Sequence, residues 1–393
     1  MDSQLLYQFN PWWEGEYQLE NVLPRPGLQQ HLEGLLDNCA VIFLTGLRRV
    51  GKTTLMKLLI QHLLQKSIAP AHIFYFSMDD YQTKDLNILE IITAYRQLQR
   101  LSIDIKVYLF LDEISYKEDF RLQLKNLHDR ERVKIFASSS SASVLQDQRG
   151  LLTGRERCVE ITPLTFDEYL AFKNIQVKQR DKALLISYFE DYLQHGGMPE
   201  YILHNNDREY LIALVDDIIY KDIIAYHKIK NSNLIKDYFI LLMERSGKQL
   251  SMNKIANILN ISTDTARRYL QMFVDCYLVY LVDRHEKTNE NLLSPKKIYA
   301  ADLGIRNLIT GFRDKGAVFE TLVFMAIKNK DPKYVYKEGV ELDFITQDQI
   351  LIEVKYGKEL NIKQLALFES YPAKQKIMIK GYEDFAKFIK TPK

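Results

Sequence analysis

The chain has 393 residues, of which 47% are hydrophobic and 26% charged; this composition excludes an intrinsically disordered protein, and the length predicts about two to four compact domains. The 53 Lys and Arg residues nearly balance the 51 Asp and Glu residues, so the net charge of +2 requires no nucleic-acid partner and any DNA contact depends on a local patch. No apolar run approaches the roughly 18 residues that span a bilayer, so we expect a cytoplasmic protein without a membrane partner.

The first informative element is a predicted strand at residues 41–45 that leads into Gly-Leu-Arg-Arg-Val-Gly-Lys-Thr-Thr and then an apolar helix. A GxxxxGKT sequence between a strand and a helix is typical of a phosphate-binding P-loop, whose backbone amides and helix N-terminus surround an anion. Lys52 would contact the β- and γ-phosphates, and Thr53 would offer its hydroxyl to Mg²⁺. The residues expected to bind ATP are Gly46, Arg48, Arg49, Val50, Gly51, Lys52, Thr53 and Thr54.

A continuously apolar strand at residues 107–112 ends in Asp112 and Glu113. Strands of this kind are buried in parallel sheets, and their carboxyl ends carry the site residues. We expect Asp112 to hold Mg²⁺ and Glu113 to activate water. Two further strands are predicted at 72–77 and 133–137. Ser138, which follows the second of these, either senses the γ-phosphate or attacking water or simply forms a turn.

Arg155 follows the serine cluster and is the candidate arginine finger or sensor, because its permanent charge and planar donors suit phosphate oxygens. It would act in its own subunit or in a neighbour, and the second alternative requires a homo-oligomer. A surface ion pair is the remaining alternative. The nucleotide is expected to be ATP, since no guanine-reading Asn-Lys-x-Asp motif is evident.

Residues 165–245 read as mostly helical and are expected to form a lid or adaptor. The next segment, 246–312, contains two short predicted helices at 251–260 and 262–270 and then an apolar strand. This is the pattern of a winged helix, whose second helix would face a DNA major groove. Asp264 opposes Arg267 and Arg268, so a protein-binding role for the same module remains an alternative.

The C-terminal segment, 313–393, contains two predicted paired strands that carry Asp343, Glu353 and Lys355. Alternation along a strand places Glu353 and Lys355 on one face, beside Asp343 of the neighbouring strand. Two carboxylates can hold Mg²⁺, and the lysine can stabilise an attacking hydroxide; the alternative is an exposed charged strand face. The pattern resembles the PD-(D/E)xK nuclease core, a resemblance that implies Glu320 as an added helical acid and Gln364 on the next helix.

Several motifs together resemble one family, the prokaryotic AAA-type ATPases that carry a C-terminal domain of unknown function. They are Asn10-Pro11-Trp12-Trp13-Glu14, Pro24-Arg25, the P-loop, Leu111-Asp112-Glu113 and Gly196-Gly197-Met198-Pro199-Glu200. The resemblance spans nearly the whole chain and implies an ATP-binding module, a winged helix and a restriction-endonuclease-like tail. One departure is Leu342, which stands where the nuclease motif has proline.

The expected fold is therefore α/β: a P-loop ATPase with a parallel sheet (1–164), a helical region, a winged helix and a small α/β nuclease-like domain. The expected function is Mg²⁺-dependent ATP hydrolysis that acts on DNA or is regulated by it. Double-stranded or branched DNA would bind through the winged helix and the C-terminal domain. The alternatives are an ATP-controlled DNA endonuclease and a nonhydrolysing nucleotide switch. Cys39, Cys158 and Cys276 lack metal or disulfide spacing and are expected as buried free thiols.

Overall fold

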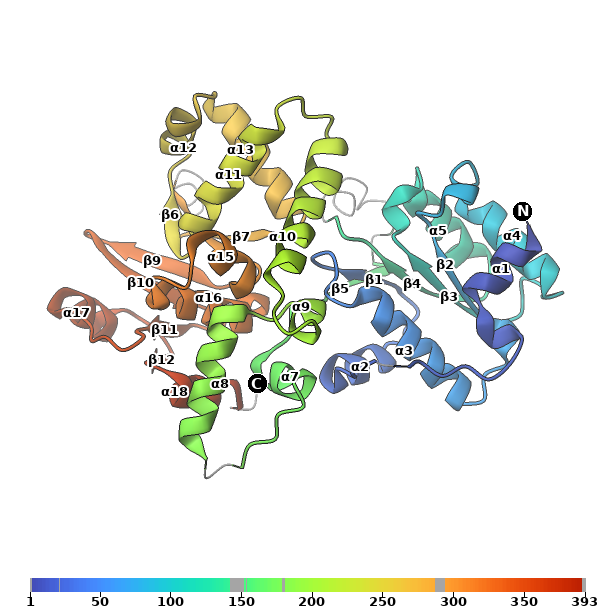
Figure 1. Ribbon diagram of the computed structural model, residues 1–393, viewed down its shortest axis with the longest axis horizontal. Helices are drawn as coiled ribbons and strands as arrows, with labels where there is room; N and C mark the ends of the chain where they lie inside the picture. The colour runs from blue at the N-terminus through green and yellow to red at the C-terminus, as the bar shows by residue number, and fades with distance from the viewer. Residues whose placement is uncertain are drawn as a thin grey trace. The chain divides into compact units, whose positions relative to one another are not determined.

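The computed structural model describes residues 2–20, 22–141, 152, 154–178, 181–286 and 294–390. The chain divides into two compact units, Met1–Thr162 and Pro163–Lys393, whose helices and strands are labelled in Figure 1. None of the described helices combines the length and the apolar character needed to cross a bilayer. The three cysteines form no disulfide among the described residues. Cys276 is buried as expected, but Cys39 and Cys158 are exposed, so that part of the prediction is wrong.

The first unit is built on a five-stranded sheet in the order β2-β3-β4-β1-β5, and every neighbouring pair is parallel. The strands are β1 (Val41–Thr45), β2 (Ile73–Ser77), β3 (Val107–Asp112), β4 (Val133–Ser138) and β5 (Glu156–Glu160). The first four confirm the predicted strands. The fifth was not predicted, because Glu-Arg-Cys-Val-Glu lacks the apolar run of a buried strand.

Helices cover both faces of this sheet, as buried parallel strands require. Figure 1 shows α2 and α3 on one face and α4 and α5 on the other. The residues of α1, α4 and α5 share one apolar core with alternate residues of the strands. The helices are α1 (Ser3–Phe9), α2 (Pro26–Glu33), α3 (Lys52–Gln65), α4 (Ile88–Leu98) and α5 (Phe120–Arg130).

The Asn-Pro-Trp-Trp segment lies along the edge strand β2. The side-chain amide of Asn10 accepts a hydrogen bond from the N–H of Tyr75 (2.7 Å) and donates one to the Tyr75 carbonyl (3.0 Å). The indole N–H groups of Trp12 and Trp13 both donate to the carbonyl of Ile73 (3.1 and 3.0 Å). Side chains of this segment thus satisfy backbone groups that an edge strand leaves unpaired.

The second unit begins with helices, which confirms the helical prediction for this region. They are α7 (Phe166–Phe172), α8 (Lys182–His195), α9 (Pro199–Leu203), α10 (Arg208–Asp217), the π-helix η6 (Ile218–Ala225) and α11 (Ser232–Glu244). Close packing requires glycine at two positions, Gly197 after α8 and Gly304 further along the chain. A Cβ atom on Gly197 would lie 2.3 Å from the carbonyl oxygen of Leu164, and one on Gly304 would lie 2.0 Å from that of His195. Asp302 accepts the N–H of Gly197 (2.7 Å) at this junction.

Two short helices, α12 (Met252–Leu259) and α13 (Thr263–Asp275), follow as predicted. Each begins after a serine that caps it: Ser251 accepts from the N–H of Lys254 (3.4 Å) and Ser262 from that of Thr265 (3.1 Å). An antiparallel sheet in the order β6-β8-β7 accompanies these helices. Its strands are β6 (Lys248–Leu250), β7 (Val279–Val282) and β8 (Lys296–Ala300), and α15 (Leu303–Thr310) comes next.

The chain ends in a mixed four-stranded sheet in the order β12-β11-β10-β9. The predicted pairing is correct: β10 and β11 are antiparallel, whereas β11 and β12 are parallel. The helix that carries Glu320 begins at Lys315, directly after Asp314, whose backbone is left-handed (φ 53°). The elements are α16 (Lys315–Ile327), β9 (Lys333–Lys337), β10 (Val340–Ile345), β11 (Ile350–Val354), α17 (Ile362–Ser370), β12 (Gln375–Ile379) and α18 (Tyr382–Lys390).

Candidate functional site

The glycine-rich loop between β1 and α3 has the backbone that a phosphate cradle needs. Gly46 and Gly51 both have positive φ angles (126° and 97°), which glycine adopts without strain. A Cβ atom at Gly46 would also lie 2.2 Å from the carbonyl oxygen of Ile161. Lys52 opens α3, and its buried ammonium donates hydrogen bonds to the carbonyls of Gly46 (2.9 Å) and Leu47 (3.0 Å). The lysine charge therefore lies inside the loop.

Three hydroxyl groups surround the carboxylate of Asp112 at the end of β3. The Thr53 hydroxyl donates to Oδ2 (2.6 Å), and so does the hydroxyl of Tyr75 (2.8 Å). The Ser138 hydroxyl donates to Oδ1. In the sheet β3 lies between β2 and β4, which carry Tyr75 and Ser138, whereas Thr53 comes from the first turn of α3. The fold thus brings P-loop, Asp112 and Ser138 together at one sheet edge.

Glu113 lies next to this carboxylate in a left-handed backbone conformation (φ 48°). Its N–H donates to Ser138 Oγ (2.9 Å), and its side chain accepts from the hydroxyl of Ser140 (3.1 Å). Burial raises the pKa of Glu113 above the ordinary value, while the charges of Lys52 and Arg48 oppose the rise. A carboxylate with a raised pKa beside a phosphate cradle has the properties of a proton acceptor.

Arg155 does not join this group. It immediately precedes β5, and its carbonyl accepts a hydrogen bond from the N–H of Val41 at the start of β1 (2.8 Å). Arg155 therefore lies at the amino edge of the sheet, whereas the P-loop follows the carboxyl end of β1. Its guanidinium contacts both oxygens of Asp129 at 2.8 Å. The expectation of a role at the ATP site of its own chain is thus corrected to a surface ion pair. Leu151 and Thr153 beside it lie outside the described residues.

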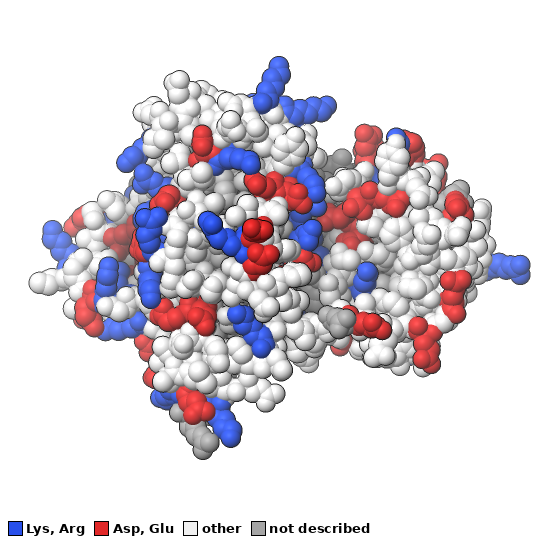
Figure 2. Space-filling model, viewed as in Figure 1, with Lys and Arg blue, Asp and Glu red and all other residues white. Residues whose placement is uncertain are grey.

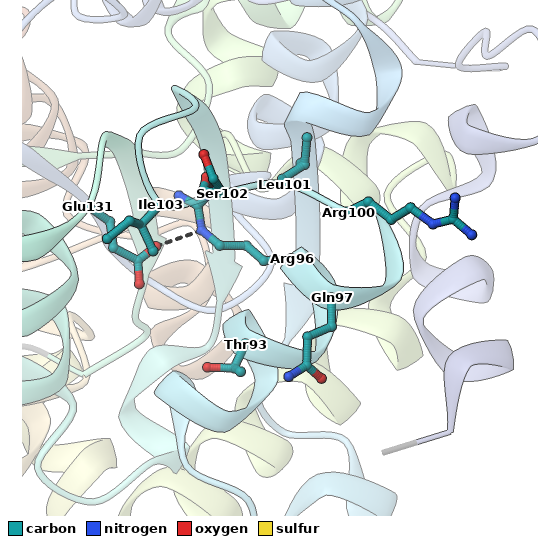
Figure 3. Close-up of a pocket in the computed structure, with 8 residues that line it drawn as sticks. All are labelled: Thr93, Arg96, Gln97, Arg100, Leu101, Ser102, Ile103 and Glu131. Atoms are coloured by element: carbon teal, nitrogen blue, oxygen red, sulfur yellow. Dashed lines mark hydrogen bonds and ion pairs between the residues drawn. The ribbon is translucent and has the colours of Figure 1, made fainter.

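The same amino edge carries a pocket of about 430 Å³. Its lining comes from the end of α4 and from residues that precede β3 and β4 (Figure 3). Arg96 donates to Glu131 across it (2.6 Å), while Arg100 points away from this ion pair. The pocket is therefore remote from the P-loop and is distinct from the nucleotide site.

Two of the predicted acids, Glu320 and Asp343, contact a buried lysine, together with Glu341, which was not predicted. Lys297 of β8 is 1% exposed, and its ammonium lies 2.6 Å from Glu320 of α16, 2.7 Å from Glu341 and 3.4 Å from Asp343, both of β10. Tyr299 also donates to Glu320 (2.6 Å). Burial alone would lower the pKa of Lys297, but the acids, led by Glu320, raise it well above the ordinary value. The three carboxylates therefore favour the charged form of the lysine.

Glu353 and Lys355 form a second pair beside this one, 2.9 Å apart. Glu353 also accepts the backbone N–H of Asp343 (3.1 Å), and burial raises its pKa. Gln364 does not contact these acids directly; its amide donates to the Glu341 carbonyl (3.4 Å). No group of three His, Cys, Asp or Glu side chains among the described residues has an arrangement that could hold a metal ion. With the ammonium of Lys297 between them, these acids do not fit a divalent cation.

The helix α13 presents Arg267 to solvent, with 67% of its side chain exposed and Asp264 at 3.6 Å. On the face that Figure 2 shows, Lys and Arg are interspersed with Asp and Glu among the described residues. Sequence reasoning missed Tyr75 and Lys297. Tyr75 lies in an apolar strand and Lys297 in a short one. Neither position indicates a function in the sequence, because only the tertiary structure places acids next to these side chains.

A parallel sheet with a P-loop after one strand and an acid pair after another defines an AAA-type P-loop ATPase domain. Family models match an AAA domain at residues 38–170 and a domain of unknown function (DUF8612) at 186–316. The chain is 31% identical over 341 residues to the uncharacterized protein MJ1544 of Methanocaldococcus jannaschii, covering 80% of this chain and 74% of that protein. It belongs to the family of AAA-domain proteins that includes MJ1544.

A second relative is an uncharacterized protein of Haemophilus influenzae, 25% identical over 84% of this chain and 86% of its own length. Among solved structures, AMPPCP-bound DnaA from Aquifex aeolicus matches 65% of this chain and 90% of its own at 17% identity, with a TM-score of 0.30.

Proposed function

We propose that the protein is a Mg²⁺-dependent ATPase whose nucleotide cycle is coupled to DNA. The observation that carries the first part is the 2.6 Å contact between Thr53 and Asp112 beside the buried ammonium of Lys52. Hydroxyl and carboxylate oxygens are the ligands that Mg²⁺ prefers, so the residues present fit this ion. When bound, Mg²⁺ would neutralise charge on the β- and γ-phosphates.

Each residue of the candidate nucleotide site has a defined task in this proposal. The P-loop amides and Lys52 bind the phosphates, and Lys52 exchanges its carbonyl partners for phosphate oxygens. Glu113 accepts a proton from the attacking water. Ser140, which donates to Glu113 (3.1 Å), and Ser138, which holds its N–H, orient that carboxylate.

Arg155 is proposed to act on ATP bound to a neighbouring copy, because it lies at the edge of the sheet opposite its own P-loop. A mixing experiment tests this role. Arg155→Ala and Lys52→Ala chains would each be inactive alone, and their mixture would recover turnover only if an arginine reaches across subunits. A fully active Arg155→Ala protein removes Arg155 from the mechanism.

The coupling to DNA is proposed from the helices α12 and α13 with their antiparallel strands, which we interpret as a winged helix. Hydrolysis would move the helical region and this module relative to the ATPase core. A nonhydrolysing nucleotide switch remains the alternative, and tight ATP binding with very slow turnover would favour it. A cleavage function for the C-terminal sheet, which we interpret as nuclease-like, is disfavoured by the position of Lys297.

The decisive experiment measures ATP turnover by the full chain with and without double-stranded, single-stranded and branched DNA. Turnover that requires Mg²⁺, disappears in Lys52→Ala and rises with one DNA form supports the whole proposal. Turnover that no DNA changes would retain the ATPase and remove the coupling. Failure to bind any magnesium nucleotide would remove both.

A further inference from the structure

We propose that the ammonium of Lys297 is the built-in cation of the C-terminal acidic cluster and occupies the position that a divalent metal would need. The cluster is defined here as Glu320, Glu341, Asp343 and Glu353. On this proposal it binds neither Mg²⁺ nor Mn²⁺ in the wild-type protein, and the C-terminal sheet does not cut DNA.

The first argument is geometric. Lys297 comes from β8 of the three-stranded sheet, whereas its partners come from α16 and β10 of the following segment. Its ammonium contacts Glu320, Glu341 and Asp343 at 2.6, 2.7 and 3.4 Å. Three carboxylates face one point, as the oxygen ligands of a divalent cation would, and that point is filled by a cationic side chain of the protein.

The second argument concerns what could displace the lysine. A buried charge is tolerated only when it is paired, because removing its partners costs several kcal/mol. Lys297 is 1% exposed, so an incoming metal ion would leave the ammonium buried beside a second positive charge. Because the side chain is buried, the ammonium cannot move into solvent when a metal ion binds. The metal-bound arrangement is therefore unfavourable.

The third argument is that other oxygens of the acidic cluster already have partners within the chain. Oδ2 of Asp343 accepts the backbone N–H of Val354 (2.9 Å). Glu353 accepts the N–H of Asp343 and pairs with Lys355 at 2.9 Å. Glu341 receives a further hydrogen bond from Gln249 (2.7 Å). Ammonium and N–H groups of the chain thus pair with the acids in the absence of an external ion.

The arrangement also assigns a role to the cluster. Through Lys297, β8 is joined to β10 and α16 by charge-assisted contacts that are stronger than neutral hydrogen bonds. The acids that resemble a nuclease motif would then hold the β6-β8-β7 sheet against the β12-β11-β10-β9 sheet.

The test counts Mn²⁺ ions bound to the full chain without nucleotide, from the paramagnetic resonance signal of the free ion. Wild type and Asp343→Asn should bind equally, since the cluster holds no metal in either. Lys297→Met, which keeps an unbranched side chain but lacks the ammonium group, should gain a bound Mn²⁺ ion. Lys297→Met combined with Asp343→Asn should lose that ion again.

Two outcomes would overturn the proposal. One is a Mn²⁺ ion that wild type binds and Asp343→Asn does not, a comparison that decides even if Lys297→Met fails to fold. The other is a folded Lys297→Met protein that gains no ion. Plasmid incubated with Mn²⁺ gives an independent readout: nicking by wild type that Asp343→Asn and Lys355→Ala both abolish also contradicts it. None of these results depends on ATP turnover.

Discussion

The hydroxyl of Tyr75 donates a 2.8 Å hydrogen bond to Asp112, so the edge strand β2 reaches across to the acid at the end of β3. The backbone of the same tyrosine is held on both sides by the Asn10 amide. The N-terminal segment is therefore connected to the proposed metal ligand through a single residue.

Tyr75→Phe should weaken the apparent affinity for Mg²⁺ during ATP hydrolysis by about tenfold, because a residue that orients a metal ligand typically contributes that much. The measurement is turnover as a function of Mg²⁺ at saturating ATP. Tyr95→Phe is the matched control, since its hydroxyl donates to the Ala71 carbonyl (2.6 Å) instead. Equal behaviour of the two variants would exclude an orienting role for Tyr75.

Glu113→Gln should retain ATP binding and lose about 10²- to 10⁴-fold in turnover, the usual contribution of a general base. The amide keeps the shape of the side chain but cannot accept a proton from water. Single-turnover hydrolysis and binding of a fluorescent ATP analogue separate the two effects. Unchanged hydrolysis would remove Glu113 from the mechanism.

The raised pKa of Glu113 predicts the pH dependence of turnover. The group must be ionised to accept a proton, and burial displaces its pKa upward from 4.5. Turnover should therefore fall as the pH decreases through a value above 4.5, and the acid limb of the kcat profile should lie higher than for an exposed glutamate. Glu113→Asp, if active, should displace this limb, whereas a limb that stays unchanged would assign it to another group.

Removing Arg267 and Arg268 together should weaken binding to double-stranded DNA and reduce the slope of log K against log salt by about one for each lost phosphate contact. Fluorescence anisotropy at several salt concentrations measures both quantities. Lys221→Ala is the control, because this exposed cation lies in the π-helix and pairs with Asp217 (3.0 Å). DNA binding that all variants share would place the contact elsewhere.

Gly304→Ala should destabilise the second unit by about 1 to 3 kcal/mol, the usual cost of forcing extra atoms into a packed site. The added Cβ would lie 2.0 Å from the carbonyl oxygen of His195, whereas nothing lies within 4 Å of a Cβ on Gly27. Thermal unfolding of both alanine variants checks the difference. Equal melting temperatures would show that the junction can relax.

The sequence indicated which residues of the candidate nucleotide site would lie together, because its signals are local. The P-loop and the acid pair each lie within one short segment, and four of the five strands carry the apolar runs that buried parallel strands require. The sequence left the position of Arg155 open, because β5 is polar and was not predicted. Arg155 directly precedes β5, which runs parallel to β1 and therefore begins at the amino edge of the sheet.

Lys297 could not be found in the same way. Its partners are 23 to 46 positions away in sequence, and no spacing rule relates a lysine at the start of a short strand to acids on another sheet. The spacing of Asp343, Glu353 and Lys355 correctly indicated adjacent strands. It could not indicate which cation would lie between the acids, because that depends on packing between two sheets.

The docking of Asn10, Trp12 and Trp13 on β2 has a practical consequence for work on the isolated ATPase. The AAA-domain match begins only at residue 38, so a shortened protein cut at that point would lack every one of these side chains. Its outermost strand would present bare amide and carbonyl groups, which invite pairing between copies and aggregation. Soluble preparations of the nucleotide-binding half should therefore start upstream of the first helix.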